Sequence, residues 1–313
     1  MPRVEIRLNG EWVPGWRIRQ GARNSRVRWG GENMDEREDL FPNDSVREPQ
    51  DAVQAAQFDF SRIVPVTPLR SLYRYLRSVS GGRVAHFAAV EERLGPVAGL
   101  EPEQFLGHII NISVHRFATY HNQEPFVPEG ANRLAFGNGS HFARQLAERW
   151  PHNGDGLAGM QFVDYEVSPY RTTRSCFEDG VSASRSGQGG VDLLLSRDRQ
   201  AVVGEIKAST ETVGSTFALI QALTYAVELA TDAQRARLMR HYEDRFPDRP
   251  SIGIAILLES ADSLVDGDLE MTQDLATKLM QLEDVTKHLA RISVVQLDLT
   301  TDPIAVNQIC DAH

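Results

Sequence analysis

The second half of the chain alternates short apolar runs with longer amphipathic ones. Residues 191–195 and 201–208 are rich in valine, leucine and isoleucine and flank a polar turn at 196–200, which predicts a β-hairpin. The neighbouring elements are predicted to be a helix over 140–150, a strand over 159–171, helices over 215–230 and 232–246, a buried strand over 251–260, a helix near 271–290 and a strand over 291–299. This order predicts an α/β (α+β) fold.

Charged residues interrupt the predicted hairpin. Side chains alternate along a strand, so Glu205 and Lys207 share one face. With the turn centred between Asp198 and Arg199, Asp192 lies opposite Glu205. Two opposed carboxylates destabilise a sheet unless positive charge lies between them. Lys207 supplies one such charge, and the carboxylates with a backbone carbonyl also suit a hard cation such as Mg²⁺. The alternative is a surface hairpin whose charges face water.

Lysine is rare in this chain, which uses arginine almost everywhere else. Its only lysines are Lys207, Lys278 and Lys287. A compact ammonium can hold or help to deprotonate a water, whereas a guanidinium stays charged and planar. This contrast favours a chemical role for Lys207.

Asp192, followed on the next strand by Glu205-Ile206-Lys207, resembles the signature of the PD-(D/E)XK nuclease superfamily. Gly190-Val191 stands where some members have a proline before the aspartate. The order of elements from residue 140 is similar to the core of this superfamily, which implies a mixed central β-sheet flanked by helices, a restriction-endonuclease-like core, with a smaller N-terminal β/α region. The resemblance implies that Asp192, Glu205 and the Ile206 carbonyl hold Mg²⁺, which Mn²⁺ can replace, and that Lys207 positions the attacking water. It also implies DNA as substrate and products with 5′-phosphate and 3′-hydroxyl ends.

Two further features fit the RecB-like branch of this superfamily. Gln221 and Tyr225 lie four residues apart on the helix after the hairpin and resemble its Q-x-x-x-Y motif, which supports the active site and contacts nucleic acid. Many members add an acid from the helix before the first strand, for which Glu148 is the candidate and Glu166 and Glu129 are alternatives. All of these residues can also be ordinary solvated positions.

The first 29 residues are basic and aromatic, with seven arginines against two acids and three of the four tryptophans. The segment "RLNGEWVPGWRIR" predicts a hairpin with its turn at Asn9-Gly10. Trp12 and Trp16 among arginines suggest a nucleic-acid surface; the alternative is that the tryptophans pack the β unit and the arginines face water. A second basic surface is expected on the helix over 232–246, from Arg235, Arg237 and Arg240.

Composition sets the expected context. Residues 1–130 are expected to form an N-terminal region of a β-hairpin unit and helices for recognition or partner docking, with an acidic flexible or partner-facing stretch at 32–51, and residues 131–313 to form the nuclease core. The absence of an apolar run of transmembrane length and the two distant cysteines predict a cytoplasmic protein with no zinc cluster.

Net charge bears on the partners. A formal charge of −10 disfavours a free-standing protein that grips long DNA, so a partner protein or a homo-oligomer is expected. With the resemblance described above, the chain is expected to be a prokaryotic defence nuclease, as the nuclease subunit of an anti-phage system. The alternatives are a free-standing restriction endonuclease and a non-cleaving nucleic-acid-binding or interaction subunit.

Overall fold

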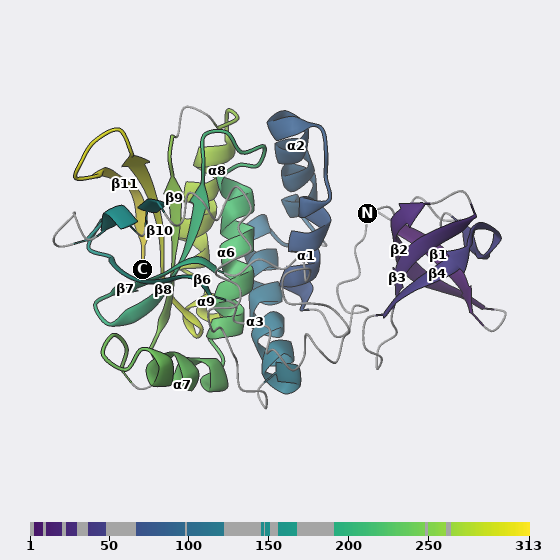
Figure 1. Cartoon of the computed structure of the whole chain (residues 1–313), viewed down its shortest axis with the longest axis horizontal. Coiled ribbons are helices and arrows are strands. Elements are labelled where there is room, and N and C mark those ends of the chain that lie inside the picture. Colours follow the sequence, from purple (N-terminus) through teal and green to yellow (C-terminus); the bar gives the residue numbers. More distant parts are fainter. Residues whose placement is uncertain are drawn as a thin grey trace. The chain divides into compact units, whose positions relative to one another are not determined.

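The chain forms two compact units, Met1–Val79 and Ser80–His313, in a computed structural model (Figure 1). The structure describes residues 3–8, 11–20, 23–29, 37–47, 67–97, 99–121, 145–146, 148–150, 156–167, 191–247, 250–260 and 264–313. The division between the two units falls at residue 79. The helices over 82–94 and 102–121 contact helices of the C-terminal unit and are part of it.

The N-terminal unit contains a five-stranded antiparallel sheet in the order β4-β3-β2-β1-β5. Its elements are β1 (Arg3–Leu8), β2 (Glu11–Gln20), β3 (Asn24–Trp29), β4 (Arg37–Pro42), a 3₁₀ turn η1 (Asn43–Ser45) and β5 (Val46–Arg47). Leu8 pairs with Glu11, as the predicted hairpin requires, and the predicted turn residues Asn9-Gly10 themselves lie outside the described residues. The prediction of a flexible stretch at 32–51 was wrong for residues 37–47, because β4 pairs with β3 and β5 pairs with β1.

The last element of this unit is helix α1 (Pro68–Arg77). The Thr67 side chain accepts a hydrogen bond from the Arg70 backbone N–H at 3.3 Å, and Pro68 occupies the first turn, where a missing N–H costs nothing. These two residues fix the start of the helix.

The C-terminal unit contains a mixed sheet, as the sequence predicted, and the sheet has six strands. Its order is β11-β10-β9-β8-β7-β6, formed by β6 (Gln161–Val167), β7 (Val191–Arg197), β8 (Gln200–Lys207), β9 (Ile252–Leu258), β10 (Leu289–Asp298) and β11 (Ala305–Ala312). The central pairs β8–β9 and β9–β10 are parallel, and the outer pairs are antiparallel. Every residue of β9 is buried, as its continuous apolar run predicted.

Helices cover one face of this sheet (Figure 1). Helices α6 (Ser215–Leu229), α8 (Asp268–Leu279) and the short α9 (Glu283–Thr286) contact the strands, and α2 (Gly82–Leu94) and α3 (Pro102–His121) pack against these helices. Helix α7 (Asp232–His241) follows α6 and lies at one end of the strands (Figure 1). Helix α6 makes the crossover from β8 toward parallel β9 and contacts both strands, while α2, α3 and α8 contact α6.

The C-terminal end of the chain differs from the prediction. The helix expected near 271–290 ends at Leu279, and β10 already begins at Leu289. Leu289 pairs with Ile252 of β9, so strand pairing overrides a helical sequence pattern there. Strand β11, which the sequence analysis did not predict, pairs antiparallel with β10.

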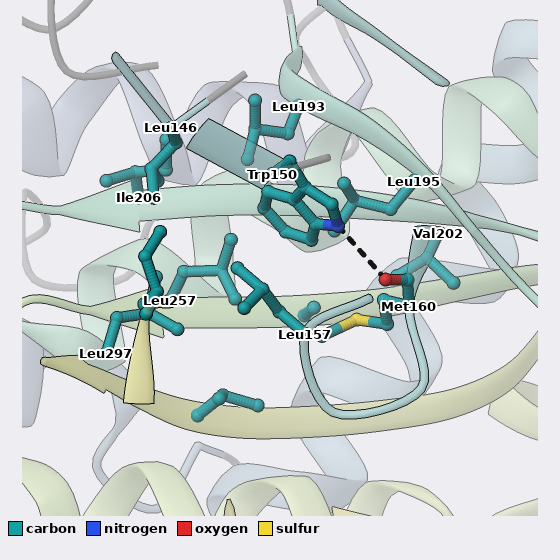
Figure 2. Packing of buried hydrophobic residues seen from close by; sticks show 13 residues of the cluster. Leu146, Trp150, Leu157, Met160, Leu193, Leu195, Val202, Ile206, Leu257 and Leu297 are labelled. Carbon is teal, nitrogen blue, oxygen red and sulfur yellow. Dashed lines mark hydrogen bonds between the residues drawn. The ribbon is translucent and has the colours of Figure 1, made fainter. Parts of the chain in front are cut away.

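An apolar cluster packs on the opposite face of the sheet (Figure 2). Trp150 lies at its centre, 2% exposed, and its indole Nε1 donates a hydrogen bond of 3.1 Å to the Met160 carbonyl. The cluster also takes in apolar side chains from β7 to β10, among them Leu193, Val202, Ile206, Leu257 and Leu297. Buried indole and aliphatic area of this kind stabilises the fold by several kcal/mol, on the order of 3 to 5 for the tryptophan alone.

A buried carboxylate fixes the start of α6. Asp268, at the beginning of α8, accepts hydrogen bonds from the backbone N–H groups of Ser215 at 2.6 Å and Thr216 at 3.1 Å. The first N–H groups of a helix lack internal partners and attract negative charge. Asp268 therefore holds the N-terminal turn of α6 against α8, close to the end of β8.

Candidate active site

The hairpin of β7 and β8 has the register that the sequence predicted. Its pairs run from Arg197 opposite Gln200 to Leu193 opposite Gly204. Asp198 and Arg199 between the strands have φ values of 51° and 63°, as a two-residue type I′ turn requires. Continued by one residue, the same register places Asp192 opposite Glu205.

The backbone pairing between β7 and β8 ends just before the charged residues. Beyond it, a backbone N–H of β8 bonds to a side chain of β7. The backbone N–H of Ile206 donates to Asp192 Oδ2 at 3.0 Å. Leu193 opposite Gly204 is the last backbone pair. Asp192 therefore lies at the open end of the hairpin, beside the backbone of the Glu205-Ile206-Lys207 segment.

Glu205 and Lys207 lie on the helix-covered face of the sheet. Ile206 belongs to the apolar cluster of Figure 2, and its neighbours along the strand face the other way. The Lys207 Nζ atom is 6.0 Å from the centre of the Phe217 ring on α6. The N-terminal part of α6 thus lies over the charged residues.

Lys207 is held between two carboxylates. Its Nζ donates to Glu205 Oε1 at 2.8 Å and lies 3.4 Å from Glu211 Oε2. Glu205 is 1% exposed and Lys207 is 6% exposed, whereas Glu211 is 32% exposed. Within the described part of the chain, Glu205 Oε2 is buried and has no hydrogen-bond partner. A buried oxygen with no partner is costly unless something binds it.

The carboxylates of Asp192, Glu205 and Glu211 share one cationic side chain, Lys207. Burial raises the pKa of Asp192, although the Lys207 charge opposes the rise. Burial and the Asp192 charge raise the pKa of Glu205 well above its usual range. Burial alone would lower the pKa of Lys207, but the charges of Glu205, Glu211 and Asp192 raise it above its usual value. One ammonium shared by three carboxylates explains why the cation is stabilised while the acids are not.

This charge balance and donor set fit a divalent cation. Three carboxylates and one ammonium leave two negative charges without a counter-charge among these four side chains. Among the described residues, no three His, Cys, Asp or Glu side chains are grouped so that they could hold a metal together. Mg²⁺ is commonly held by one or two carboxylates with waters and substrate oxygens completing its shell. Asp192 and Glu205 supply two carboxylates for such a site, and the Ile206 carbonyl supplies a further oxygen.

Sequence reasoning missed the loop that follows β8. Arg83 of α2 donates from Nε to the Glu211 carbonyl at 2.5 Å and from Nη2 to the Ser209 carbonyl. Glu259, just after β9, accepts from the Ser209 backbone N–H at 2.6 Å and from its hydroxyl at 2.8 Å. These contacts fix the loop that carries Glu211. Arg83 is 128 residues from Glu211 in sequence, so no local pattern reveals the contact.

Gln221 and Tyr225 lie on α6 as predicted. Gln221 follows Phe217 by one turn, which places it on the same side of the helix as the ring near Lys207. Gln221 is half-buried and Tyr225 is 1% exposed. Tyr225 therefore belongs to the core of this unit.

The predicted third acid, Glu148, lies on a helical stretch that packs on the opposite face of the sheet from Glu205 and Lys207. Glu148 is exposed, and Leu146 and Trp150 on the same helical stretch pack into the cluster on the opposite face of the sheet. Glu129 and the side chain of Glu166 lie outside what the structure describes. Glu211 is the third carboxylate near Lys207.

The expected basic helix surface on α7 is only partly formed. Arg237 is 3% exposed, and its guanidinium donates to the Gln234 side chain, so it is not available at the surface. Arg235 pairs with Asp232 at 3.0 Å, and Arg240 is exposed. Trp12 and Trp16 lie on β2, where the structure describes the backbone only.

No family model, curated protein or solved structure matches this chain. In the described part of the chain, no helix has the length and apolar character needed to span a membrane. The chemistry of the site itself therefore indicates the function.

Proposed function

We propose that this chain is a Mg²⁺-dependent nuclease that hydrolyses phosphodiester bonds in DNA. The observation that carries the proposal is the grouping of half-buried Asp192 with buried Glu205 and Lys207, in which Glu205 Oε2 has no partner within the described part of the chain. Together with Glu211, these side chains put three carboxylates beside one ammonium, and the two negative charges left over when all three are ionised match a divalent cation. Lys207 supplies a donor at the same place.

Each residue has a role in this proposal. Asp192, Glu205 and the Ile206 carbonyl hold the cation. Bound there, Mg²⁺ lowers the pKa of a coordinated water and neutralises charge on the phosphate. Lys207, fixed 2.8 Å from Glu205 Oε1, donates a hydrogen bond to the attacking water or to a phosphate oxygen. Gln221 supports the substrate from α6, and Tyr225 supports the packing of that helix.

The biological role is proposed from the same chemistry. A DNA nuclease with a net charge of −10 is suited to act within an assembly, because phosphate contacts dominate free-standing DNA affinity. We propose the nuclease subunit of a prokaryotic anti-phage system, with a partner protein or a second copy of the chain completing the DNA site. A free-standing restriction endonuclease is the alternative within the same reaction class.

A non-cleaving subunit is the second candidate. The observation that favours it is the direct contact of Lys207 with Glu205 and Glu211, which gives the lysine counter-charges without a metal. Buried ion pairs of this kind also occur as purely structural features.

A cleavage assay separates the two candidates. The purified chain is incubated with linear duplex, circular duplex and single-stranded DNA, in low salt and in protein excess, with Mg²⁺, with Mn²⁺ or with a chelator. The nuclease proposal expects cleavage with either cation and none with the chelator. Cleavage that persists in chelator contradicts the proposal. So does the absence of cleavage of every DNA substrate at all protein concentrations, including in the presence of the cognate partner.

A further inference from the structure

The two faces of the N-terminal sheet differ in burial. Val27 on β3 is 0% exposed and Val46 on β5 is 7% exposed. Arg7 on β1 is exposed, and Leu40 on β4 is 63% exposed. Since residues alternate between faces along a strand and opposed residues share a face, these four positions define a buried face and an outer face.

The strand register places two tryptophans on the outer face. Trp12 is opposite the exposed Arg7. Trp16, four residues further along β2, is opposite Arg28 of β3. Position 28 shares its face with position 26, whose partner is the exposed Leu40. The positions of Trp12 and Trp16 are therefore on the outer face.

The third tryptophan of this region occupies the other face. Trp29 is two positions from the buried Val27 on β3. The sequence left open whether the tryptophans pack the β unit or form a nucleic-acid surface. The register favours packing at position 29 and a surface role at positions 12 and 16.

The outer face also collects positive charge. Among the described strands, its register positions include six arginines: Arg3, Arg7, Arg19, Arg26, Arg28 and Arg47. Only two acids, Glu5 and Glu38, share this face in the same strands. The shift in register after Arg17 brings Arg19 opposite Arg26 and so onto the outer face. This surplus contrasts with the net charge of −10 of the whole chain.

We infer that the outer face of the N-terminal sheet binds single-stranded nucleic acid. Arginines pair with backbone phosphates, and tryptophans stack on unpaired bases without sequence preference, typically with about 1 to 3 kcal/mol per stacked base. The bases of a duplex are stacked on one another, so a duplex can pair its phosphates with the arginines but cannot stack bases on the tryptophans. The combination of residues selects a single strand.

This inference goes beyond the proposed nuclease and does not rest on it. Binding is measured in chelator, where metal-dependent cleavage does not occur. Loss of strand binding and loss of cleavage are therefore separate outcomes.

Fluorescence anisotropy of the full chain with labelled oligonucleotides tests the inference. The probes are oligo-dT, oligo-U and a duplex of equal length, titrated across a series of salt concentrations. We expect single strands to bind more tightly than the duplex, and the comparison of oligo-dT with oligo-U identifies DNA or RNA as the preferred strand. A duplex bound as tightly as the single strands, or no binding of either single strand at low salt, overturns the inference.

A matched pair of arginine variants localises the binding. Arg7→Gln removes one charge from the outer face, and Arg23→Gln removes one from an exposed position outside the strands. For single strands, each lost phosphate contact lowers the salt slope by about 0.7. We expect this change for Arg7→Gln and no change for Arg23→Gln. Equal effects of the two variants contradict the proposed surface.

The tryptophans are tested with a conservative and a truncating change. Trp12→Ala should weaken oligo-dT binding by roughly 5-fold to 150-fold, the equivalent of about 1 to 3 kcal/mol of stacking, and Trp12→Phe should restore much of it. Circular dichroism and the unfolding temperature check the fold of both variants. A folded Trp12→Ala variant that binds oligo-dT like the wild type overturns the role of the tryptophans.

Discussion

At the scale of single residues, the site combines one cation with more acids than it can neutralise. Lys207 contacts Glu205 and Glu211, and Asp192 bonds the backbone beside them. Without a metal ion, ionised Glu205 is therefore less stable in the folded protein than in the unfolded chain, which is the physical meaning of its raised pKa.

Glu205→Gln should stabilise the metal-free protein at alkaline pH. An acid with a raised folded-state pKa binds more protons when folded, so its contribution to stability is greatest below about pH 4 and is lost as the pH rises through the folded pKa. Thermal unfolding in chelator should show a higher midpoint for Glu205→Gln than for wild type at pH 8, and a smaller difference at pH 4. Glu283→Gln, at a position 85% exposed, is the control. A lower midpoint for Glu205→Gln at pH 8 would mean that its ion pair with Lys207 outweighs its burial.

At the scale of elements, the hairpin that carries the site could be predicted from the sequence, but the parts around it could not. The alternation of apolar and charged residues and the polar turn fix the register of β7 and β8, because a shift by one residue would bury the wrong face. The contact of Arg83 with the loop after β8 depends on how α2 packs against α6, which no local pattern encodes.

The loop after β8 gives an element-scale prediction. Arg83→Gln removes the guanidinium that holds the Ser209 and Glu211 carbonyls. Hydrogen bonds from a charged group to backbone typically contribute about 1.5 to 3 kcal/mol. We expect faster amide hydrogen exchange in residues 209–214 and slower cleavage, because Glu211 no longer fixes Lys207. Arg245→Gln, at an exposed position, should change neither quantity. If the Arg83→Gln variant exchanged the amide hydrogens of this loop at the wild-type rate, Glu259 alone would be sufficient to hold the loop.

At the scale of the whole molecule, charge is unevenly distributed. The chain carries a net charge of −10, while the outer face of the N-terminal sheet is basic. The sequence predicted the mixed sheet and its flanking helices, because those elements have strong periodicity. It did not predict β4, β5 and β11, since strands at polar positions are recognised only by their pairing partners.

The isolated chain should bind duplex DNA weakly at physiological salt. Non-specific binding of this kind has dissociation constants of roughly 10⁻⁴ to 10⁻⁶ M, because few phosphates are neutralised. Anisotropy measurements with a duplex probe should give a value in or above that range, and binding and cleavage should increase with a partner protein or on assembly. Nanomolar binding and efficient cleavage by a monomer would favour the free-standing restriction enzyme instead.

The most direct test of the central claim compares cleavage by Glu205→Gln and Glu283→Gln with cleavage by the wild type, under single-turnover conditions with Mg²⁺. Both variants lose one carboxylate charge, but only Glu205 belongs to the proposed site. Glu205 would act through the cation that it holds, and loss of one group that stabilises transition-state charge typically lowers the rate by about 10² to 10³-fold. The account predicts such a loss, or complete loss, for Glu205→Gln and an unchanged rate for Glu283→Gln. Equal rates for Glu205→Gln and the wild type would contradict the assignment of the active site.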